Sequence, residues 1–439
     1  MPSSNLTSRL TVSATLPRYR LKASEAVKVG FLAPLSGDVQ AWGEPGYNGC
    51  QIWAEWIKEA GGILVSGRHH KIEIVPFDCG YDPELALTGA RELVHDHDVK
   101  LLMMLGGDTF PPVQEFVTRN KVLTSTLLPS DLSPDTPYLI APCEVHPIYN
   151  VTGVDWLAET RPELKTAALC AQRDSLGLPS AATYRAAFEA AGIDLVKEIF
   201  FPVQSFDAAA IVSAMLADQP HILCWDTSYE PFVHALTEAA FAQGYSGQIM
   251  SCTGDDYQRL IARTSASFME GFLFQFPDFD DPALNAHKVN FGRPNAFYEE
   301  FTRRFPGTWS AVSWEYVSVL ELWKSAVEAA NTVEPVSVLA AMKAGGRGAH
   351  AFGEAHWWGR DLFGIDNALV GDWPVVAIRD GKARIQDFRS IPNWLERHGD
   401  LLKHHMRGLG QLWDQRVVPR MPADEEVPGH QFLRGQRAG

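Results

Sequence analysis

Short apolar runs alternate with stretches of helical periodicity along most of the chain. The run from Val27 to Ala33 is broken only by Lys28 and Gly30, and a helical stretch at 46–60 follows it. The alternation continues to about residue 126 and restarts after Pro142. Strands that alternate with helices at this spacing are typical of parallel sheets built from βαβ units. We therefore expect an α/β protein with two successive doubly wound sheets.

The pattern places the individual elements. In the first part we expect strands at 27–33, 72–75, 101–105 and 122–126 and helices at 46–60, 84–95 and 113–119. In the second part we expect strands at 166–171, 195–200, 221–225 and 248–251 and helices at 181–191, 208–217 and 230–243. Long helices are expected at 294–304 and 310–330, and a β-rich region at 351–388 with a turn at Asp380-Gly381. From Pro392 we expect a tail, whose first half can form an amphipathic helix.

Length and charge exclude some classes of protein. A chain of 439 residues exceeds what one hydrophobic core usually supports, so two lobes are expected. A formal net charge of -15 argues against a nucleic-acid partner, which requires clustered Lys and Arg. No apolar run approaches the ~20 residues that span a bilayer, so the protein is not expected to be membrane-inserted.

The N-terminus and the cysteines leave alternatives open. Residues 1–26 hold scattered Arg and Lys and no continuous apolar segment, which is not the pattern of a secretory signal. Either the protein stays in the cytoplasm, or an export signal lies outside this chain. Of the six cysteines, Cys50 and Cys79 could pair, but six free thiols are favoured over that pairing.

Several short motifs resemble one family in their order and spacing. Residues 29–37, with the sequence VGFLAPLSG, and then Trp42-Gly43 resemble the first strand and ligand loop of type I periplasmic binding proteins. Within that fold the similarity is to the branched-chain amino acid and amide-binding family of ABC transporters. The resemblance continues in order over about 27–388, with the matching residues Ala60-Gly61-Gly62-Ile63, Phe77-Asp78, Asp82-Pro83, Leu93-Val94, Asp207 and Asp380-Gly381-Lys382.

The resemblance implies two doubly wound lobes joined by three chain crossings, with a ligand in the cleft between them. It places lobe one at 27–141 with 276–347 and lobe two at 144–273 with 350–390. Residues 1–26 are then an N-terminal segment and 392–439 a C-terminal tail. Ligands of open α/β sheets lie beyond the carboxyl ends of the strands, which agrees with a cleft formed by the loops that follow them. The resemblance implies a periplasmic protein, whereas residues 1–26 leave a cytoplasmic one open.

The loops that follow the strands supply the candidate ligand-binding residues. We expect the ligand to contact Trp42, Gly107, Asp108, Thr109, Ser125, Thr126, Trp225, Asp226, Tyr229, Thr253 and Phe274. Glycine lets backbone approach a ligand closely, and the Thr hydroxyl can donate or accept a hydrogen bond. For Trp225 and Asp226 the structural alternative is a strand-end core residue and a helix cap.

Three positions depart from the pattern of the amino-acid binders in this family. Leu128 aligns with the Thr that holds the ligand carboxylate, and Thr253 aligns with the acid that holds the ammonium. Leu176 replaces a Tyr that many relatives place before Gly177. A Leu cannot hydrogen-bond a carboxylate, and a neutral Thr supplies no counter-charge. We therefore expect an aromatic acid or an amide-like molecule as the ligand, and not a free α-amino acid.

The sequence offers no arrangement on which catalysis could rest. It contains no nucleophile elbow, no phosphate-binding P-loop and no dinucleotide fingerprint after the first strand. His95-Asp96-His97-Asp98 falls at a predicted helix end, where a solvated connector is favoured over a metal site. We expect a binding protein with no cofactor and no metal, acting as the solute-binding component of an ABC importer with a permease as partner. The alternatives are a cytoplasmic sensor that signals to a regulatory protein and, less favoured, an α/β enzyme.

Overall fold

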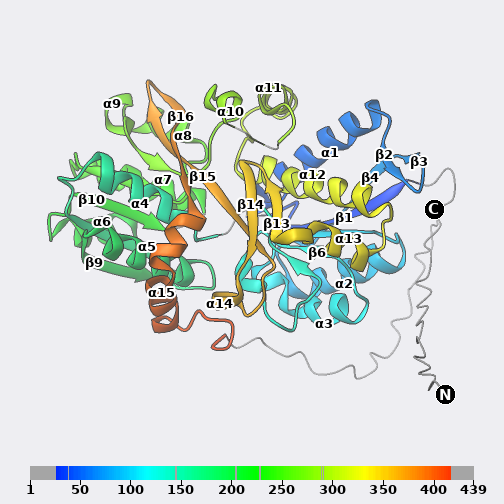
Figure 1. The fold of residues 1–439 in the computed structure, drawn as a ribbon. Helices are drawn as coiled ribbons and strands as arrows, with labels where there is room; N and C mark the ends of the chain where they lie inside the picture. Colours follow the sequence, from blue (N-terminus) through cyan, green and yellow to red (C-terminus); the bar gives the residue numbers. More distant parts are fainter. Residues whose placement is uncertain are drawn as a thin grey trace, which may run out of the picture.

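The computed structural model describes residues 26–416 except 38, 144–145, 203–204, 227–228, 288 and 290. The expectation that residues 1–26 contain no secretory signal concerns a segment of which residues 1–25 lie outside the described residues. Residues 417–439 also lie outside them. The described chain forms two lobes, each built around one sheet, which lie side by side (Figure 1).

A five-stranded parallel sheet forms the first lobe. Its strand order is β4-β1-β5-β6-β7. β4 follows β1 along the chain but lies at the edge of the sheet, and the later strands pair on the other side of β1. The strands are β1 (Val27–Ala33), β4 (Ile72–Asp78), β5 (Leu102–Met104), β6 (Thr124–Ser125) and β7 (Leu139–Ile140). β1 is almost wholly buried because helices cover both faces of the sheet, which explains its unbroken apolar sequence.

Two layers of helices enclose this sheet. On one side lie α1 (Glu44–Glu59) and α12 (Val312–Ala330), which pack on each other, and on the other side lie α2 (Pro83–His95) and α3 (Pro111–Arg119) (Figure 1). The lobe also contains α11 (Pro294–Arg304), α13 (Pro335–Met342), the short helix α10 (Ala283–Ala286) and the hairpin of β2 (Ile63–Val65) and β3 (Arg68–His70). Gly49 of α1 contacts the α12 backbone so closely that an added Cβ would lie 2.0 Å from the Ser313 oxygen.

The second lobe repeats this topology and extends it. Five parallel strands run in the order β9-β8-β10-β11-β12, the same winding as in the first lobe. They are β8 (Thr166–Gln172), β9 (Asp194–Phe201), β10 (Ile222–Asp226), β11 (Gln248–Ser251) and β12 (Leu273–Phe274). Antiparallel strands complete a nine-stranded sheet beyond β12, namely β13 (Arg347–His350), β14 (Gly353–Trp358), β15 (Ala368–Arg379) and β16 (Lys382–Ser390).

Helices cover this larger sheet too. They are α4 (Asn150–Thr160), α5 (Gly177–Ala191), α6 (Ala208–Leu216), α7 (Glu230–Ala242), α8 (Tyr257–Arg263), α9 (Ala266–Met269) and α15 (Ile391–Gly408). α4 and α15 pack against α5, whereas α6 packs against α7. None of the described helices is long and apolar enough to cross a membrane.

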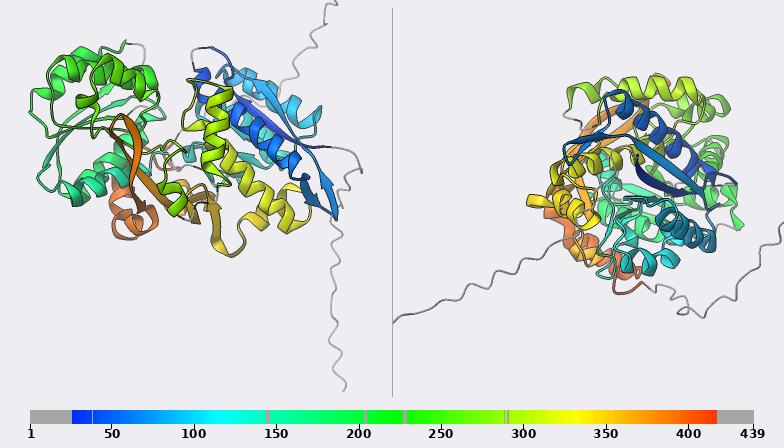
Figure 2. Two further views of the ribbon diagram at one scale, coloured as in Figure 1. Left: turned by 90° about the horizontal axis from the view of Figure 1, so that it is seen from above. Right: turned by 90° about the vertical axis from the view of Figure 1, so that its right-hand side faces the viewer.

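The chain passes between the lobes three times, as a doubly wound two-lobed protein requires. Two crossings follow β7 and β12, the third lies between α13 and β15, and Figure 2 shows from above how the chain joins the two lobes. Two of them pair directly: the Ala141 N–H donates to the Asn367 oxygen at 2.9 Å, and the Leu369 N–H donates to the Ala141 oxygen at 3.0 Å. The crossing after β12 is tied to the β15–β16 hairpin, since Asp281 accepts from the Ile385 N–H at 2.6 Å.

The segment expected as a C-terminal tail is folded as far as the structure describes it. α15 buries Ile391, Trp394, Leu402 and Met406, and His405 lies 2.8 Å from the Glu189 carboxylate of α5. The chain then returns to the first lobe, because Arg416 Nη2 donates to the Leu132 oxygen at 3.1 Å. Residues 391–416 are therefore part of the globular structure and contact both lobes.

Most expected elements agree with the structure to within a few residues, but the helices α4, α8 and α13 and the β2–β3 hairpin were not expected. β6 has two residues where we expected five, and β7 was not expected at all. A strand of two residues has no recognisable alternation, and its position depends on the neighbouring strand that pairs with it. All six cysteines are buried free thiols, and Cys50 and Cys79 do not pair.

Candidate functional site

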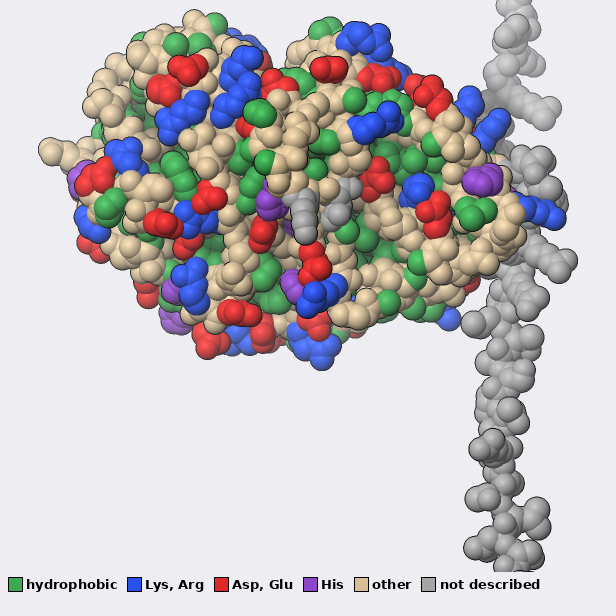
Figure 3. Space-filling model, turned by 45° about the horizontal axis from the view of Figure 1, so that its top comes forward, with side chains coloured by type: hydrophobic (Ala, Val, Ile, Leu, Met, Phe, Trp, Pro, Cys, Tyr) green, Lys and Arg blue, Asp and Glu red, His purple; other side chains and the backbone are tan. Residues whose placement is uncertain are grey.

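The cavity between the lobes is built from the loops that follow the strands. It is formed by residues of both lobes, and the space between them, including the part open to solvent, is about 610 Å³. Its lining is Ala41, Trp42, Tyr81, Leu105, Leu127, Leu128, His146, Tyr149, Leu176, Thr253, Asp255, Phe276, Ser310, Ala311, Val312 and Glu315. A concave space lined mainly by apolar side chains, with a few polar groups among them, is typical of a small-molecule site. Figure 3 shows the groove between the two halves, with both acidic and basic side chains around it on this face.

Aromatic rings form much of the cavity wall. Trp42 lies edge-on to Tyr81 with ring centroids 5.7 Å apart, and it contacts Tyr229 of the other lobe at 5.9 Å. Tyr149 stacks on Trp373 at 5.4 Å and meets Phe276 edge-on at 5.1 Å. These packed contacts hold the rings in place, so the wall offers a ligand fixed apolar faces.

Four of the residues expected from the sequence line the cavity or its continuation. Trp42 and Thr253 line the main cavity. Tyr229 lines an adjoining space that shares Trp42 and Asp255, and Phe274 lines another that shares Asp255 and Phe276. The three spaces are therefore parts of one groove between the lobes.

Thr109, Ser125 and Thr126, which were expected to contact the ligand, instead stabilise the loops after β5 and β6 or lie buried in β6. Thr109 Oγ1 donates to the Gly106 oxygen at 2.9 Å, and Thr126 Oγ1 donates to Asp131 at 2.7 Å. Ser125 is buried in β6. The structure places these side chains behind the residues that line the cavity, where they shape the loops.

Gly107 and Asp108 lie next to the groove without lining the main cavity. The Gly107 N–H donates to Asp131 at 3.1 Å, and an added Cβ would lie 2.8 Å from the Tyr81 hydroxyl. The Asp108 carboxylate accepts a hydrogen bond from Ser175 of the second lobe. Burial and the negative charge of Asp174 raise the pKa of Asp108.

Trp225 and Asp226 are core residues of the second lobe. Trp225 is 0% exposed, and its Nε1 donates to Thr237 of α7 at 3.2 Å. Asp226 is also buried and accepts a hydrogen bond from Ser180, which in turn accepts from Asn150. This placement matches the structural alternative for Trp225, while Asp226 stabilises α5 and α4 and caps no helix through its side chain.

The three positions that depart from the amino-acid binders all line the cavity. Leu128, Leu176 and Thr253 lie around the same space. Thr253 is 3% exposed, and its Oγ1 accepts from the Asp255 N–H at 3.3 Å. Their side chains thus give the ligand two apolar surfaces and one hydroxyl.

Two acids that line the cavity, Asp255 and Glu315, were not among the ligand contacts expected from the sequence, although the loop that carries Asp255 was expected to face the cleft. Asp255 accepts a hydrogen bond from the Ala311 N–H at the start of α12, and burial together with the charge of Glu230 raises its pKa to about 7. Glu315 lies one turn into α12 and is 1% exposed. The signal for Glu315 was an acid within the apolar helical run 312–320, which is unusual in a buried helix.

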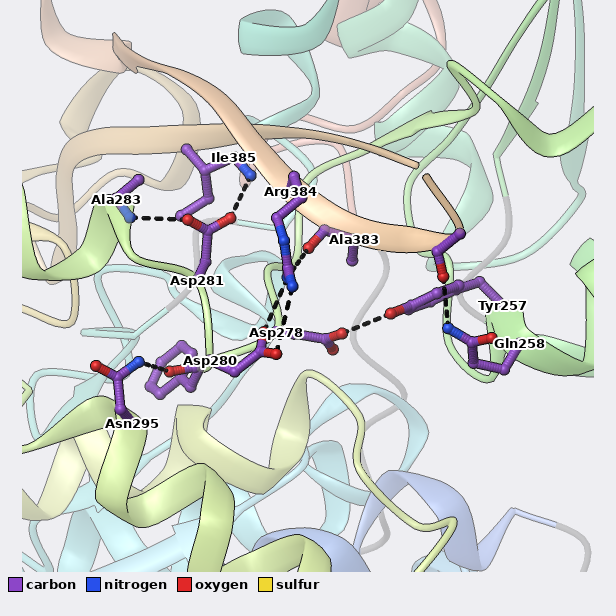
Figure 4. Close-up of polar contacts among 12 residues, drawn as sticks. Tyr257, Gln258, Asp278, Asp280, Asp281, Ala283, Asn295, Ala383, Arg384 and Ile385 are labelled. Atoms are coloured by element: carbon purple, nitrogen blue, oxygen red, sulfur yellow. Dashed lines mark hydrogen bonds and ion pairs between the residues drawn. The ribbon is translucent and has the colours of Figure 1, made fainter. Parts of the chain in front are cut away.

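A network of acids and one arginine lies beside the outer part of the groove, which Tyr257 and Asp278 line (Figure 4). The Tyr257 hydroxyl donates to Asp278 at 2.7 Å, and burial raises the pKa of Asp278 to about 6. Arg384 donates to Asp280 at 2.9 Å. This network connects the crossing after β12 to both α8 and β16 of the second lobe.

Two doubly wound lobes, three crossings and an apolar cavity between them define a two-lobed binding protein. The sequence matches the periplasmic binding protein family over residues 26–383, and the chain belongs to that family. The family consists of binding proteins, and its fold is the one expected from the resemblance in the sequence. The sequence matches no curated protein.

Solved structures share the fold at low identity. An ABC transporter substrate-binding protein from Sphaerobacter thermophilus superposes with a TM-score of 0.68 at 19% identity, covering 83% of this chain and 98% of that one. A leucine-binding protein from Thermotoga maritima gives 0.67 at 16% identity, covering 84% and 100%. An R. palustris solute-binding protein in complex with 4-hydroxybenzoate gives 0.65 at 18% identity, covering 83% and 96%. The neighbours match nearly their whole length, so the two-lobed fold is shared.

Proposed function

We propose that this chain is the substrate-binding component of an ABC importer, which closes its two lobes around a small organic molecule and presents the closed form to a permease. The observation that carries the proposal is the cavity, because residues of both lobes line one largely apolar space. A ligand that contacts both lobes stabilises the closed form over the open one. The family is a transport family of binding proteins, which supports binding rather than catalysis.

We propose further that the ligand has a flat apolar body. Trp42, Tyr81, Tyr149 and Phe276 supply aromatic surfaces around the space, and such surfaces suit a ring better than a branched aliphatic chain. Neighbours of the same fold were solved with benzoate and with 4-hydroxybenzoate, so the fold accommodates one-ring ligands. Since Leu128 and Leu176 replace polar residues of the amino-acid binders, free α-amino acids are not expected to bind.

A thermal-shift screen tests this function on the purified full chain. The compounds are one-ring acids, amides and amines, with leucine and valine for comparison. A ligand at 100 times its dissociation constant adds about 2.7 kcal/mol to the free energy of unfolding. A raised Tm with one-ring compounds supports the proposal. An increase with the amino acids alone would contradict the proposed ligand class.

A further inference from the structure

Basic side chains lie around the groove (Figure 3), but the charged side chains among the described residues that line its three connected parts are all acidic. Its three connected parts are lined by the acids Glu44, Glu230, Asp255, Asp256, Asp278 and Glu315. No Lys or Arg is among the described residues that line them. A ligand carboxylate would therefore lack a cationic side chain in this space and would lie close to the buried carboxylate of Glu315.

Backbone N–H groups, the other usual partners of an anion, are already used by aspartates of the protein itself. Asp255 accepts from the Ala311 N–H where α12 begins. Asp174 accepts from the Leu176 and Gly177 N–H groups at 3.0 and 2.8 Å where α5 begins. Asp131 accepts from the Gly107 N–H in the first lobe. At these three places an aspartate of the protein already occupies the N–H groups that could otherwise bind an anion.

The remaining basic groups near the groove do not change this balance. Burial lowers the pKa of His146 to about 4, so its imidazole is neutral near pH 7. At the outer end of the groove Arg384 is paired with Asp280 (Figure 4). Arg259 at the entrance lies 3.8 Å from the Glu230 carboxylate. Each of these three basic side chains is therefore either neutral or next to an acid.

The aromatic walls favour the same charge as the acids. The face of an aromatic ring carries partial negative charge and attracts a cation, most strongly for Trp and in desolvated sites. Trp42 and Tyr149 line the cavity together with Asp255 and Glu315. Carboxylates and ring faces in one enclosed space are the chemistry that recognises an organic ammonium group.

We propose that the cleft selects an organic cation: a protonated amine on a flat apolar body, with its ammonium group against Asp255 and Glu315 and its body against the aromatic wall. This inference rests on the proposed function, because it specifies the ligand of the same cavity. It departs from the aromatic acids expected from the sequence and from the benzoates bound by neighbours of the fold. An amide-like ligand, the other class expected from the sequence, would have the same flat body but no positive charge.

Three ligands with the same ring and different head groups test the proposal by isothermal titration calorimetry on the full chain at pH 8. Benzylamine is positive, benzamide neutral and benzoate negative. We expect benzylamine to bind at least about tenfold more tightly than benzoate, with benzamide between them. Affinity for benzoate equal to or above that for benzylamine would overturn the proposal.

Two charge-removing variants locate the ammonium site. Asp255→Asn and Glu315→Gln each keep the side-chain shape, and we expect each to weaken benzylamine roughly tenfold while leaving benzamide nearly unchanged. Glu73→Gln, an exposed acid on β4, is the matched control and should bind benzylamine as the natural chain does. Unchanged benzylamine binding by both cleft variants would overturn the assigned site. Should a variant fail to fold, the three ligands on the natural chain still decide the charge preference.

The outcomes separate this inference from the proposed function. Binding of benzoate or benzamide without benzylamine overturns the cation preference and leaves the role of an aromatic-binding importer component standing. Binding of none of the three at millimolar concentration overturns the cation preference and the flat-bodied ligand together.

Discussion

Trp42 of the first lobe and Tyr229 of the second lie edge to face across the cleft, with ring centroids 5.9 Å apart and planes at 75°. Trp42 precedes α1, and Tyr229 is the residue before α7. The same indole lines the main cavity. One side chain therefore contacts both the opposite lobe and the space for the ligand.

Removal of this indole should reduce ligand binding more than stability. Trp42→Ala is expected to cost about 2 kcal/mol or more of binding free energy, as for a buried aromatic anchor, with a small change in Tm. Calorimetry with the best ligand of the one-ring series, together with thermal unfolding, measures both. Unchanged affinity in a folded Trp42→Ala protein would remove Trp42 from the site.

Trp225→Ala is the matched comparison, because the sequence offered both tryptophans as ligand contacts. Trp225 is fully buried beside Thr237, so its loss should lower the free energy of unfolding by about 3 kcal/mol or more. Protein that still folds should bind with nearly normal affinity. A stable variant with lost affinity would instead place Trp225 in the binding site.

Free α-amino acids should bind poorly. Leu128 and Leu176 present hydrocarbon to the cavity, so a ligand carboxylate finds no hydroxyl partner at those two positions. Calorimetry with leucine, isoleucine and valine should give no binding tighter than the millimolar range. A micromolar dissociation constant for any of the three contradicts this expectation.

Amine binding should strengthen as the pH rises through 7. The pKa of Asp255 is raised to about 7, so at pH 6 this carboxyl is mostly protonated and at pH 8 mostly charged, while benzylamine stays protonated. The acids around it are Glu44, Glu230, Asp256, Asp278 and Glu315. Arg259 lies next to Glu230, and His234 and His146 are the nearby imidazoles.

Two controls test this pH dependence: the neutral ligand benzamide and the variant Asp255→Asn, which has no charge at this position. Benzamide affinity should change little between pH 6 and pH 8, and Asp255→Asn should lose most of the slope for benzylamine. Asp278, whose pKa is about 6, titrates at the lower end of the same range and accounts for any residual slope. A benzylamine affinity that falls with rising pH would contradict the assignment of Asp255.

The C-terminal segment should stabilise the fold through its contacts with both lobes. Truncation after Gly408 removes the buried Leu412 and the bond from the Trp413 N–H to the Leu362 oxygen at 3.1 Å. It also removes the bond from Arg416 to Leu132. We expect a loss of about 2 kcal/mol in the free energy of unfolding. A chain ending at Arg416 is the control, and equal Tm values for both truncations would show that residues 409–416 add nothing.

The alternation of strands and helices was enough to predict the lobes because both sheets are parallel and buried on both faces. Their strands are therefore apolar runs, which a sequence displays directly. The sequence indicated that an amphipathic helix could form after residue 391, but it could not show that this helix, α15, is part of the globular structure. That depends on the packing of α15 against α5, which the sequence does not display.

The site was predictable only where the family resemblance placed a residue. Trp42 and Thr253 follow a strand at a recognisable position, and both line the cavity. Asp255 and Glu315 are far apart in the chain and face one space only because α12 begins beside the loop after β11. Whether an acid in a loop is solvated or buried depends on tertiary packing, and so does the sign of charge that a cleft prefers.

Closure of the lobes around a ligand is tested most directly by small-angle X-ray scattering of the full chain. The radius of gyration is measured without ligand and at saturation with the tightest binder among benzylamine, benzamide and benzoate. We expect a smaller radius and a narrower pair-distance distribution with ligand, because contacts from both lobes draw the cleft shut. A radius of gyration that stays the same at saturation, with binding verified by calorimetry on the same sample, would contradict the two-lobed clamp.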